Sequence, residues 1–519
     1  MSPQYLSPGV YVEEVDKGSK PIEGVGTAVA GFVGFAAMGP VNKPTFVANW
    51  TQFTGLFGAF VPGAYLAHAV YGYFNNGGGS CYVLRLPSGG EEAPAGPAAA
   101  LPAKAAGSPT TLRALAKESG AGGEGIAVEI SDAGDDKFNL TVRRGATEEK
   151  YEGLSLSTAR GAQNAVETVN KASKLVTLEE VKVAGAALAE RAPAPGTYAL
   201  RPAETQAITV SKQSPDVYQG NVADRSGLGG FEAIDDITMI ACPDLLGAYQ
   251  AGAINREGVK AVQLAMIAHC ENMKDRVAIL DPLPDLSAQE VKDWRMTEAG
   301  YDSKYAALYY PWIQVANPTP GANGSSMFIP PSGHLAGIWA RSDTERGVHK
   351  APANEVIRGV LGLQNNITKS EQDSLNPVGV NCIRAFPGRG IRVWGARTLS
   401  SDPAWRYINV RRLFNFVEES IMLGTQWVVF EPNDQALWQR VKRTIVGFLT
   451  RVWRDGALFG LTPEEAFFVK CDAENNPPET RDVGQLIVEI GIAPVKPAEF
   501  VIFRISQYSG GGGVEEAAA

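Results

Sequence analysis

Residues 392–420 constrain the fold of this chain most, because arginines alternate there with aromatic and apolar residues. The segment reads RVWGARTLSSDPAWRYINVRRLFNFVEES and contains no histidine, no cysteine and no phosphate-binding loop. Aromatic and apolar side chains at this density are expected to bury, with the guanidinium groups held between them. The pattern therefore predicts a structural element and not an active site.

The length and charge of the chain exclude several classes of protein. A chain of 519 residues is too long for one compact core, so we expect two to four domains. The formal net charge of −9 argues against a nucleic-acid partner, since nucleic-acid binders usually carry a basic excess. The five cysteines are odd in number and form no C-x-x-C pair, which favours a reducing compartment over a disulfide framework.

No segment of the sequence predicts membrane insertion or signal-dependent export. The N-terminus lacks both a basic region and an apolar one, so it does not resemble a secretory signal. The longest run of small apolar residues, 27–38, is too short and too rich in glycine to span a bilayer. We expect a buried strand there, and no direct membrane insertion.

Residues 1–22 are predicted to form an N-terminal arm, because prolines and a glycine interrupt any helix. Within it, residues 10–15 have the composition of a short strand. Its candidate contact residues are Val10, Tyr11, Val12, Glu13 and Val15. Fully extended, such an arm reaches about 70 Å, far beyond its own domain. The alternative, a strand that folds back onto its own sheet, stays equally open from this segment alone.

Residues 23–86 and 226–375 are predicted to form one middle α/β domain, because strand and helix patterns alternate along both. Expected elements include a helix near residues 256–273, a strand at 276–280 and a helix at 354–363. Between the two halves, residues 87–225 are predicted to be an inserted, surface-facing, mostly β module. Stretches rich in proline and alanine flank it and are typical of flexible joints.

Residues 376–498 are predicted to form a C-terminal α+β domain. We expect a strand at residues 426–430, a helix at 434–453 and a long strand at 482–492. Residues 499–519 are predicted to form a C-terminal arm, with an isolated strand followed by a disordered tail. The candidate contact residues of this arm are Phe500, Val501, Ile502, Phe503 and Ile505.

One face of the predicted helix at residues 434–453 carries a row of arginines. At about 100° per residue, Arg440, Arg443 and Arg451 lie together, and Arg454 joins them if the helix continues by one residue. A solvated face is the ordinary interpretation of such a row. An acidic partner surface is the functional one, because the planar guanidinium fork matches carboxylates.

Residues that would support catalysis, cofactor binding or metal binding are not found, so we predict none of the three. No P-loop motif occurs, and the glycine-rich stretch at residues 24–29 lacks the third glycine of a dinucleotide fingerprint. The four histidines show no metal-ligand spacing. Adjacent carboxylates such as Glu464 and Glu465 are typical of helix caps.

Several segments resemble the contractile tail sheath proteins of myophages, R-type pyocins and extracellular contractile injection systems. The resemblance covers residues 5–15, 34–44, 53–58 and 75–86, and it is most specific in residues 392–420. It covers most of the chain outside the insertion. These motifs do not separate a phage sheath from a pyocin or an injection-system sheath.

The resemblance implies a virion or particle structural protein and not an enzyme. It implies an α/β and α+β multidomain fold, with a subtilisin-like fold in the middle domain and extended β arms at both ends. Sheath subunits of that family form hexameric rings, stacked helically around an inner tube protein and bounded by baseplate and tail terminator proteins. Their arms exchange strands between neighbours, and their C-terminal domain faces the tube, which implies a tube-facing role for Arg440, Arg443, Arg451 and Arg454.

The resemblance also implies assembly in the bacterial cytoplasm as part of a phage tail or a phage-tail-like particle. Two alternatives stay open beside it. One is an α/β hydrolase-type enzyme, such as a subtilisin-fold protease with Ser325 or Ser326 as nucleophile and His269 and Asp244 upstream. The other is a non-contractile shell protein.

Overall fold

The structure is a computed structural model that describes residues 21–504 with short gaps. The gaps are residues 89–96, 105–108, 118–124, 135, 158, 160–161, 182–186, 201–207, 209, 211 and 320–323. The predicted strand at residues 10–15 and its five contact residues therefore lie outside the described part of the chain.

The centre of the molecule is an eight-stranded sheet in the order β18-β17-β13-β12-β11-β1-β3-β2. The six inner strands run parallel and the two edge strands run antiparallel to their neighbours. Their bounds are β1 (Val29–Gly34), β2 (Thr45–Val47), β3 (Ser80–Arg85), β11 (Met239–Ala241), β12 (Val277–Leu280), β13 (Ala306–Tyr310), β17 (Val380–Phe386) and β18 (Gly390–Val393). Most residues of the inner strands are buried, as expected for a parallel sheet covered on both faces.

Helices cover both faces of this sheet and form two apolar layers. One layer packs α1 (Trp50–Phe57), α2 (Leu66–Asn75) and α9 (Ser332–Arg346) against the strands. The other packs α6 (Asp244–Gln250), α7 (Arg256–Met273) and α8 (Ala288–Asp293) against the opposite face. The helix expected near residues 256–273 is confirmed, because its apolar positions recur at the period of a helix face.

Two expectations for this part of the chain are wrong. Residues 354–363 form no helix, and β16 (Val360–Leu363) instead joins β14 (Ile313–Ala316) and β15 (Ser326–Ile329) in a small antiparallel sheet. Asn354 and Gly359 have φ values of +61° and +81°, which a right-handed helix cannot accommodate. The central sheet also runs past residue 376, since β17 and β18 pair with it and not with the C-terminal helices.

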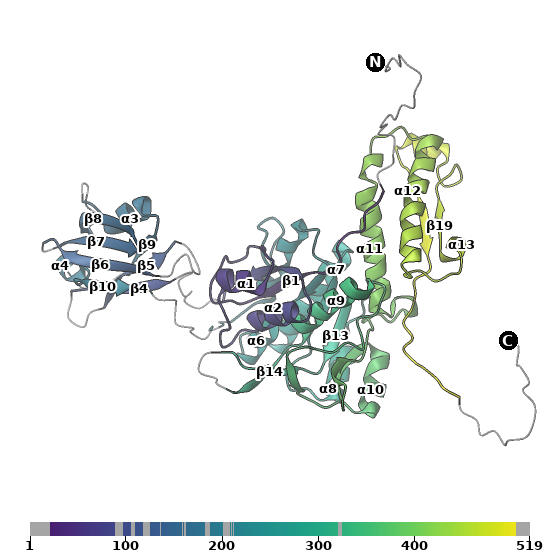
Figure 1. Cartoon of the computed structure of the whole chain (residues 1–519), viewed down its shortest axis with the longest axis horizontal. Helices are drawn as coiled ribbons and strands as arrows, with labels where there is room; N and C mark the ends of the chain where they lie inside the picture. Colours follow the sequence, from purple (N-terminus) through teal and green to yellow (C-terminus); the bar gives the residue numbers. More distant parts are fainter. Residues whose placement is uncertain are drawn as a thin grey trace, which may run out of the picture.

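The inserted module has its own core, built between a three-stranded and a four-stranded sheet. Figure 1 shows it to one side of the central sheet. Its elements are β4 (Ala98–Pro102), β5 (Thr110–Ala116), β6 (Ile126–Asp132), β7 (Lys137–Arg144), β8 (Thr147–Ser155), α3 (Ala165–Ala172), β9 (Val176–Glu180), α4 (Leu188–Arg191) and β10 (Gly196–Ala199). The expected end at residue 225 is too late. Val210 and Tyr218 of the following segment, which includes α5 (Pro215–Gln219), pack into the central core beside Phe35.

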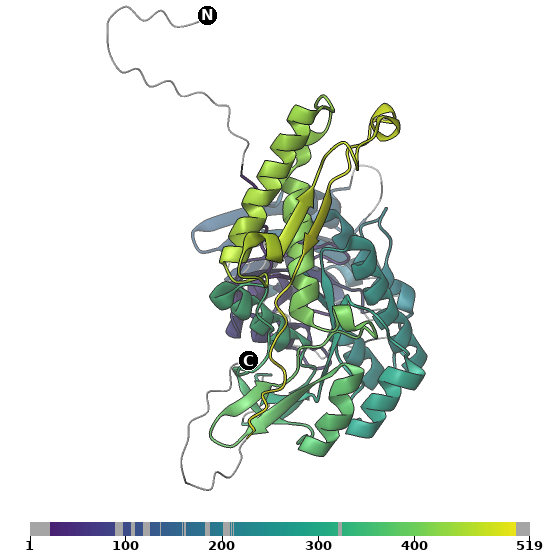
Figure 2. The same cartoon turned by 90° about the vertical axis from the view of Figure 1, so that its right-hand side faces the viewer.

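The C-terminal part consists of two long helices and a two-stranded sheet. Helix α11 (Ile408–Gly424) packs on α12 (Gln435–Arg454), and β19 (Phe467–Lys470) pairs antiparallel with β20 (Glu489–Ile492). Figure 2 shows the two yellow strands beside the yellow-green helix α12. The short helices α13 (Pro463–Ala466) and α14 (Pro478–Asp482) complete it. Helix α10 (Lys369–Leu375) instead packs Leu375 into the core of the central sheet.

Two strand predictions fail in this part. Residues 426–428 form a short 3-10 helix, and Phe430 follows with a φ of +68°, outside the strand region. The long strand expected at residues 482–492 is confined to β20, because α14 ends at Asp482 and Gly484 turns the chain with a φ of +76°. The helix expected at residues 434–453 is confirmed as α12.

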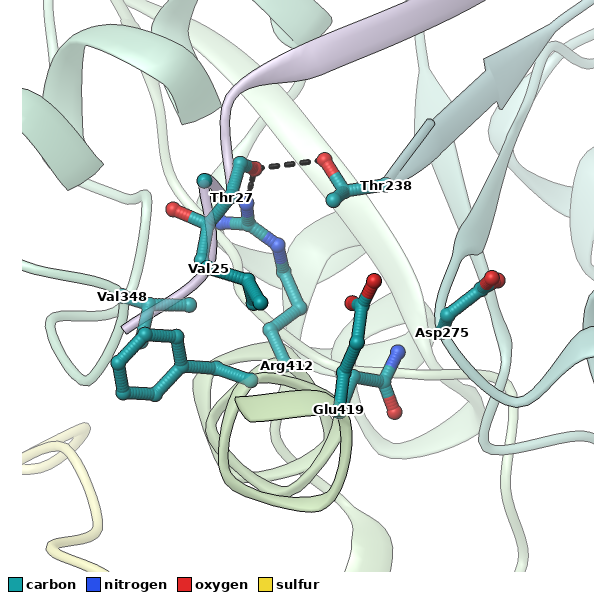
Figure 3. Close-up of a pocket in the computed structure, with 10 residues that line it drawn as sticks. Val25, Thr27, Thr238, Asp275, Val348, Arg412 and Glu419 are labelled. Atoms are coloured by element: carbon teal, nitrogen blue, oxygen red, sulfur yellow. Dashed lines mark hydrogen bonds between the residues drawn. The ribbon is translucent and has the colours of Figure 1, made fainter. Parts of the chain in front are cut away.

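A buried ion pair joins the C-terminal helices to the central part. Arg412 on α11 donates two hydrogen bonds to Asp343 on α9, at 2.8 and 2.5 Å, and the two side chains are only 3% and 4% exposed. Arg412 also donates to the backbone carbonyl of Thr27 at 2.9 Å and lies over the ring of Trp339. Figure 3 shows the guanidinium group reaching Thr27, whose carbonyl also accepts from Thr238.

We expect Asp343→Ala to lower the free energy of unfolding by about 3 kcal/mol, because it leaves the buried guanidinium group of Arg412 without its counter-ion. Urea denaturation followed by tryptophan fluorescence measures this loss. The matched control is Glu431→Ala, which removes the exposed ion pair with Arg440. That control is expected to cost less than about 1 kcal/mol. Equal losses for the two variants would contradict the importance of the Arg412 pair.

Candidate interaction surfaces

The crevice where open α/β sheets usually bind ligands is occupied here by a carboxylate of the chain itself. That crevice lies at the carboxyl ends of the strands, where the strand order reverses, between β1 and β11. Asp244 sits there and accepts backbone hydrogen bonds from Phe35 at 2.6 Å, from Leu66 at 3.1 Å and from Tyr65. Burial raises the pKa of Asp244 to about 7, although the three donors oppose that shift. Asp244 therefore fastens β1 and α2 to α6.

The residues of the protease alternative have separate partners. Asp244 is held by backbone donors, and His269 faces Arg276 at 3.4 Å. The hydroxyl oxygen of Ser326 accepts from Gln314 at 2.7 Å. In the described part of the chain, no hydrogen bond joins these side chains into a nucleophile, base and acid.

The residues that the structure describes also contain neither a cluster of metal ligands nor a helix suited to a membrane. No group of three or more histidine, cysteine, aspartate or glutamate side chains could hold a metal ion there. None of the helices formed by these residues is long and apolar enough to span a membrane. All five cysteines are unpaired and buried.

The root of the N-terminal arm lies along helix α11. Ile22 is buried, packs against Gly424 and accepts a hydrogen bond from Arg451 at its carbonyl. The backbone N–H of Val25 donates to the hydroxyl of Ser420 at 3.1 Å. A Cβ at Gly24 would lie 2.8 Å from the ring of Phe416, so only glycine allows this close approach. The described chain therefore begins beside the C-terminal end of α11, at Ser420 and Gly424.

A single carboxylate fixes the root of the C-terminal arm. Glu499 accepts two hydrogen bonds from Arg397, at 2.9 and 2.6 Å. It also accepts from the amide of Asn376 at 2.7 Å and from the hydroxyl of Tyr407 at 3.0 Å. Burial tends to raise the pKa of this carboxyl, but Arg397 and Asn376 outweigh it and lower the pKa. We call these four residues the Glu499 clamp.

Beyond the Glu499 clamp, the described part of the C-terminal arm is exposed and apolar. Phe500, Val501, Ile502 and Phe503 are 71%, 69%, 79% and 82% exposed, and residues 500–504 belong to no strand of this chain. Ile505 lies outside the described residues. A run of four exposed apolar residues is a signal of binding to another surface.

The sheet of β19 and β20 offers edges to which a further strand could add. Among the described residues, β19 and β20 pair only with each other in this sheet. Phe468 on β19 is 53% exposed. A two-stranded sheet has only marginal stability by itself, and its outer edges present unpaired backbone N–H and C=O groups.

The four arginines expected to face a partner lie on the exposed side of α12. Two of them have partners within the chain. Arg440 forms a 2.6 Å ion pair with Glu431 and stacks on Trp427, and Arg451 donates to Ile22. Among the described residues, the side chains of Arg443 and Arg454 have no hydrogen-bond or ion-pair partner. The opposite side of α12 packs into the core through Leu437, Trp438, Val441, Ile445, Phe448, Leu449 and Val452.

The sequence analysis missed the Glu499 clamp. It placed Glu499 at the start of the arm but gave it no role. Arg397 and Tyr407 belong to residues 392–420, so their region was recognised as structural. Their partner lies 102 and 92 positions away in the sequence, and no local pattern reports such a contact.

Two family models match this chain. Together they cover more than half of its residues, and the second match begins where the first ends. The phage tail sheath protein central domain matches residues 233–399. The phage tail sheath C-terminal domain matches residues 400–507. The boundary between the two domains lies after β18, in agreement with the extent of the central sheet.

Individual relatives extend the similarity over nearly the whole chain. The tail sheath protein of Burkholderia phage BcepMu is 23% identical and covers 97% of each protein. The tail sheath protein of Vibrio phage KVP40 is 29% identical over 34% of this chain, a match that spans only 26% of that relative. The helical sheath of the anti-feeding prophage in its contracted state is similar in structure, with a TM-score of 0.58 and 26% identity over 97% of this chain and 99% of that one.

We expect Glu499→Gln to release the root of the C-terminal arm, because an amide cannot accept both hydrogen bonds from Arg397. Amide hydrogen exchange in residues 489–499 should quicken, while exchange in α11 stays unchanged. The pKa of the Glu499 carboxyl is lowered in the folded state. In the wild type, the contribution of the clamp is therefore complete above the ordinary carboxyl pKa of 4.5 and is lost as the pH falls through the lowered pKa.

The control for this experiment is Glu474→Gln, which removes an exposed ion pair with Lys470. Neither the exchange rates nor their pH dependence should change in that variant. Unaltered exchange in Glu499→Gln would mean that the clamp does not fix the arm.

Proposed function

Because this chain belongs to the phage tail sheath family, we propose that it polymerises around an inner tube and contracts to push that tube through a target envelope. The family predicted from residues 392–420 is confirmed, and its members are structural sheath subunits, which points away from an enzyme. The observation that carries the proposal is the similarity to a contracted helical sheath over 97% of the chain. A chain in the structure of the anti-feeding prophage baseplate is also similar, with 26% identity and a TM-score of 0.57, and supports a baseplate as neighbour.

In this proposal, the two arms link neighbouring copies by adding strands to a sheet. The roots of both arms are fixed, at Ile22 and at Glu499, while residues 500–503 are exposed beyond the clamp. Main-chain hydrogen bonds give an added edge strand its affinity, and alternate side chains give it specificity. The sheet of β19 and β20 is the acceptor we favour, because its outer edges are unpaired in the described chain.

The exposed side of α12 faces the inner tube in this proposal. Its arginines suit an acidic tube surface, because guanidinium groups bind carboxylates through paired, charge-assisted hydrogen bonds. Arg443 and Arg454 carry most of this recognition, since Arg440 and Arg451 already have partners within the chain.

Contraction in this proposal needs neither nucleotide nor catalysis. Rigid subunits in hexameric rings rearrange from a metastable extended lattice to one that buries more surface. A few hundred Å² of extra buried area contributes roughly 5–10 kcal/mol per subunit before ordering costs. A subtilisin-like central domain suits this role, because a parallel sheet packed on both faces transmits force without deforming. Assembly takes place in the bacterial cytoplasm, with an inner tube, a baseplate and a terminator as partners.

Deleting residues 1–15 is expected to give a folded chain that no longer forms sheaths, because the root at Ile22 stays in place while the exchanged strand is lost. Circular dichroism checks the fold, and negative-stain electron microscopy checks assembly. Removing residues 510–519, which lie beyond the strand expected at 500–505, is the matched truncation and should leave assembly intact. Ordered sheaths of normal symmetry from the first deletion would refute strand exchange by the N-terminal arm.

Replacing both Arg443 and Arg454 by glutamate is expected to reduce tube-filled, extended particles at least about tenfold, because like charges would then meet across the interface. Counting particles by electron microscopy after co-expression with the tube protein measures the effect. The matched control carries the same charge change on the inserted module, Arg143→Glu with Lys150→Glu. A normal yield of tube-filled particles from the α12 variant would exclude a tube-facing α12.

A further inference from the structure

Helix α12 contains an exposed glycine that the fold of this chain does not require. Gly447 lies well inside α12, where glycine is among the least favourable residues for a helix. A Cβ built at Gly447 meets no atom within 4 Å. By contrast, a Cβ at Gly24 or Gly424 would approach a neighbouring side chain to 2.8 or 2.6 Å. The packing of the described chain therefore does not explain the glycine at position 447.

Gly447 lies in the middle of the arginine row. It follows Arg443 by four positions and precedes Arg451 and Arg454 by four and seven, so all of them share one face of the helix. Arg443 and Arg454, the two arginines without a partner in the described chain, stand on either side of it. About 16 Å of helix separates them along its axis, given a rise of 1.5 Å per residue.

We propose that an acidic segment of the inner tube protein packs directly against the backbone of α12 at Gly447. Its carboxylates bind Arg443 and Arg454 on either side of that contact. This inference rests on the proposed tube-facing role of α12 and adds a steric requirement to its charge. The charge of the row selects an acidic partner, and the missing side chain lets that partner approach the helix axis closely.

The physical reason is that paired guanidinium–carboxylate hydrogen bonds require a narrow range of distances and angles. A methyl group at position 447 would hold the partner's backbone away from α12. Both ion pairs would then lengthen together, although neither arginine had changed. Position 447 is thus a specificity-determining residue of the interface, and its effect acts through Arg443 and Arg454.

The test is Gly447→Ala in the full chain, read out in two ways. The melting temperature of the protein without the tube should stay the same or rise, because alanine favours a helix more than glycine does. The yield of tube-filled, extended particles should fall about tenfold, the change expected for a moderate loss of interface energy. A residue that serves only the fold would move both measurements in the same direction.

Gly55→Ala is the matched control. Gly55 is also a helical glycine, in α1, and a Cβ built there likewise meets no atom within 4 Å. Its replacement should leave the yield of tube-filled particles unchanged.

Four outcomes would overturn the inference. A lower melting temperature for Gly447→Ala would assign the glycine to the fold. An equal loss of polymers that form without the tube would make a second copy of this chain the partner. Normal tube-filled particles from Gly447→Ala but not from the Arg443 and Arg454 variant would refute the close contact alone. Normal particles from both variants would refute the tube-facing role itself.

Discussion

The buried ion pair between Arg412 and Asp343 ties together three segments that are far apart in the sequence. Arg412 belongs to α11, Asp343 to α9, and both also bond to Thr27 in the strand-like segment that leads into β1. Removing either charge leaves the other buried without a partner, which costs far more than the pair itself contributes. The orientation of the C-terminal helices relative to the central sheet therefore depends on this contact.

Residues 392–420 contact the chain close to the roots of both arms. Arg412 binds the carbonyl of Thr27 just after the N-terminal root, and Arg397 binds Glu499 at the C-terminal root. The same segment contributes the end of β18 and most of α11. Both contacts are charge-assisted hydrogen bonds that tie the arm roots to the folded part of the chain. This arrangement suits subunits that must stay linked while their bodies move.

The central sheet has an α/β architecture of a kind that often binds ligands. Its strand order creates the crevice in which related architectures bind ligands. The Asp244 side chain lies in that crevice, where its carboxylate accepts hydrogen bonds from three backbone N–H groups of the same chain. The family to which the chain belongs is one of structural sheath subunits. In the function proposed above, the surfaces that act are the arm roots, the two-stranded sheet and the exposed side of α12.

The sequence by itself determined the family, the alternating α/β pattern and the amphipathic helix α12, because burial leaves a periodic signal in nearby residues. It misjudged residues 354–363 and 482–492, where left-handed backbone at Asn354, Gly359 and Gly484 interrupts patterns that otherwise looked regular. Only the tertiary structure decided that β17 and β18 complete the central sheet, and that Glu499 meets Arg397. Periodicity reports which side of an element is buried, but the partner on that side is chosen by packing between distant segments.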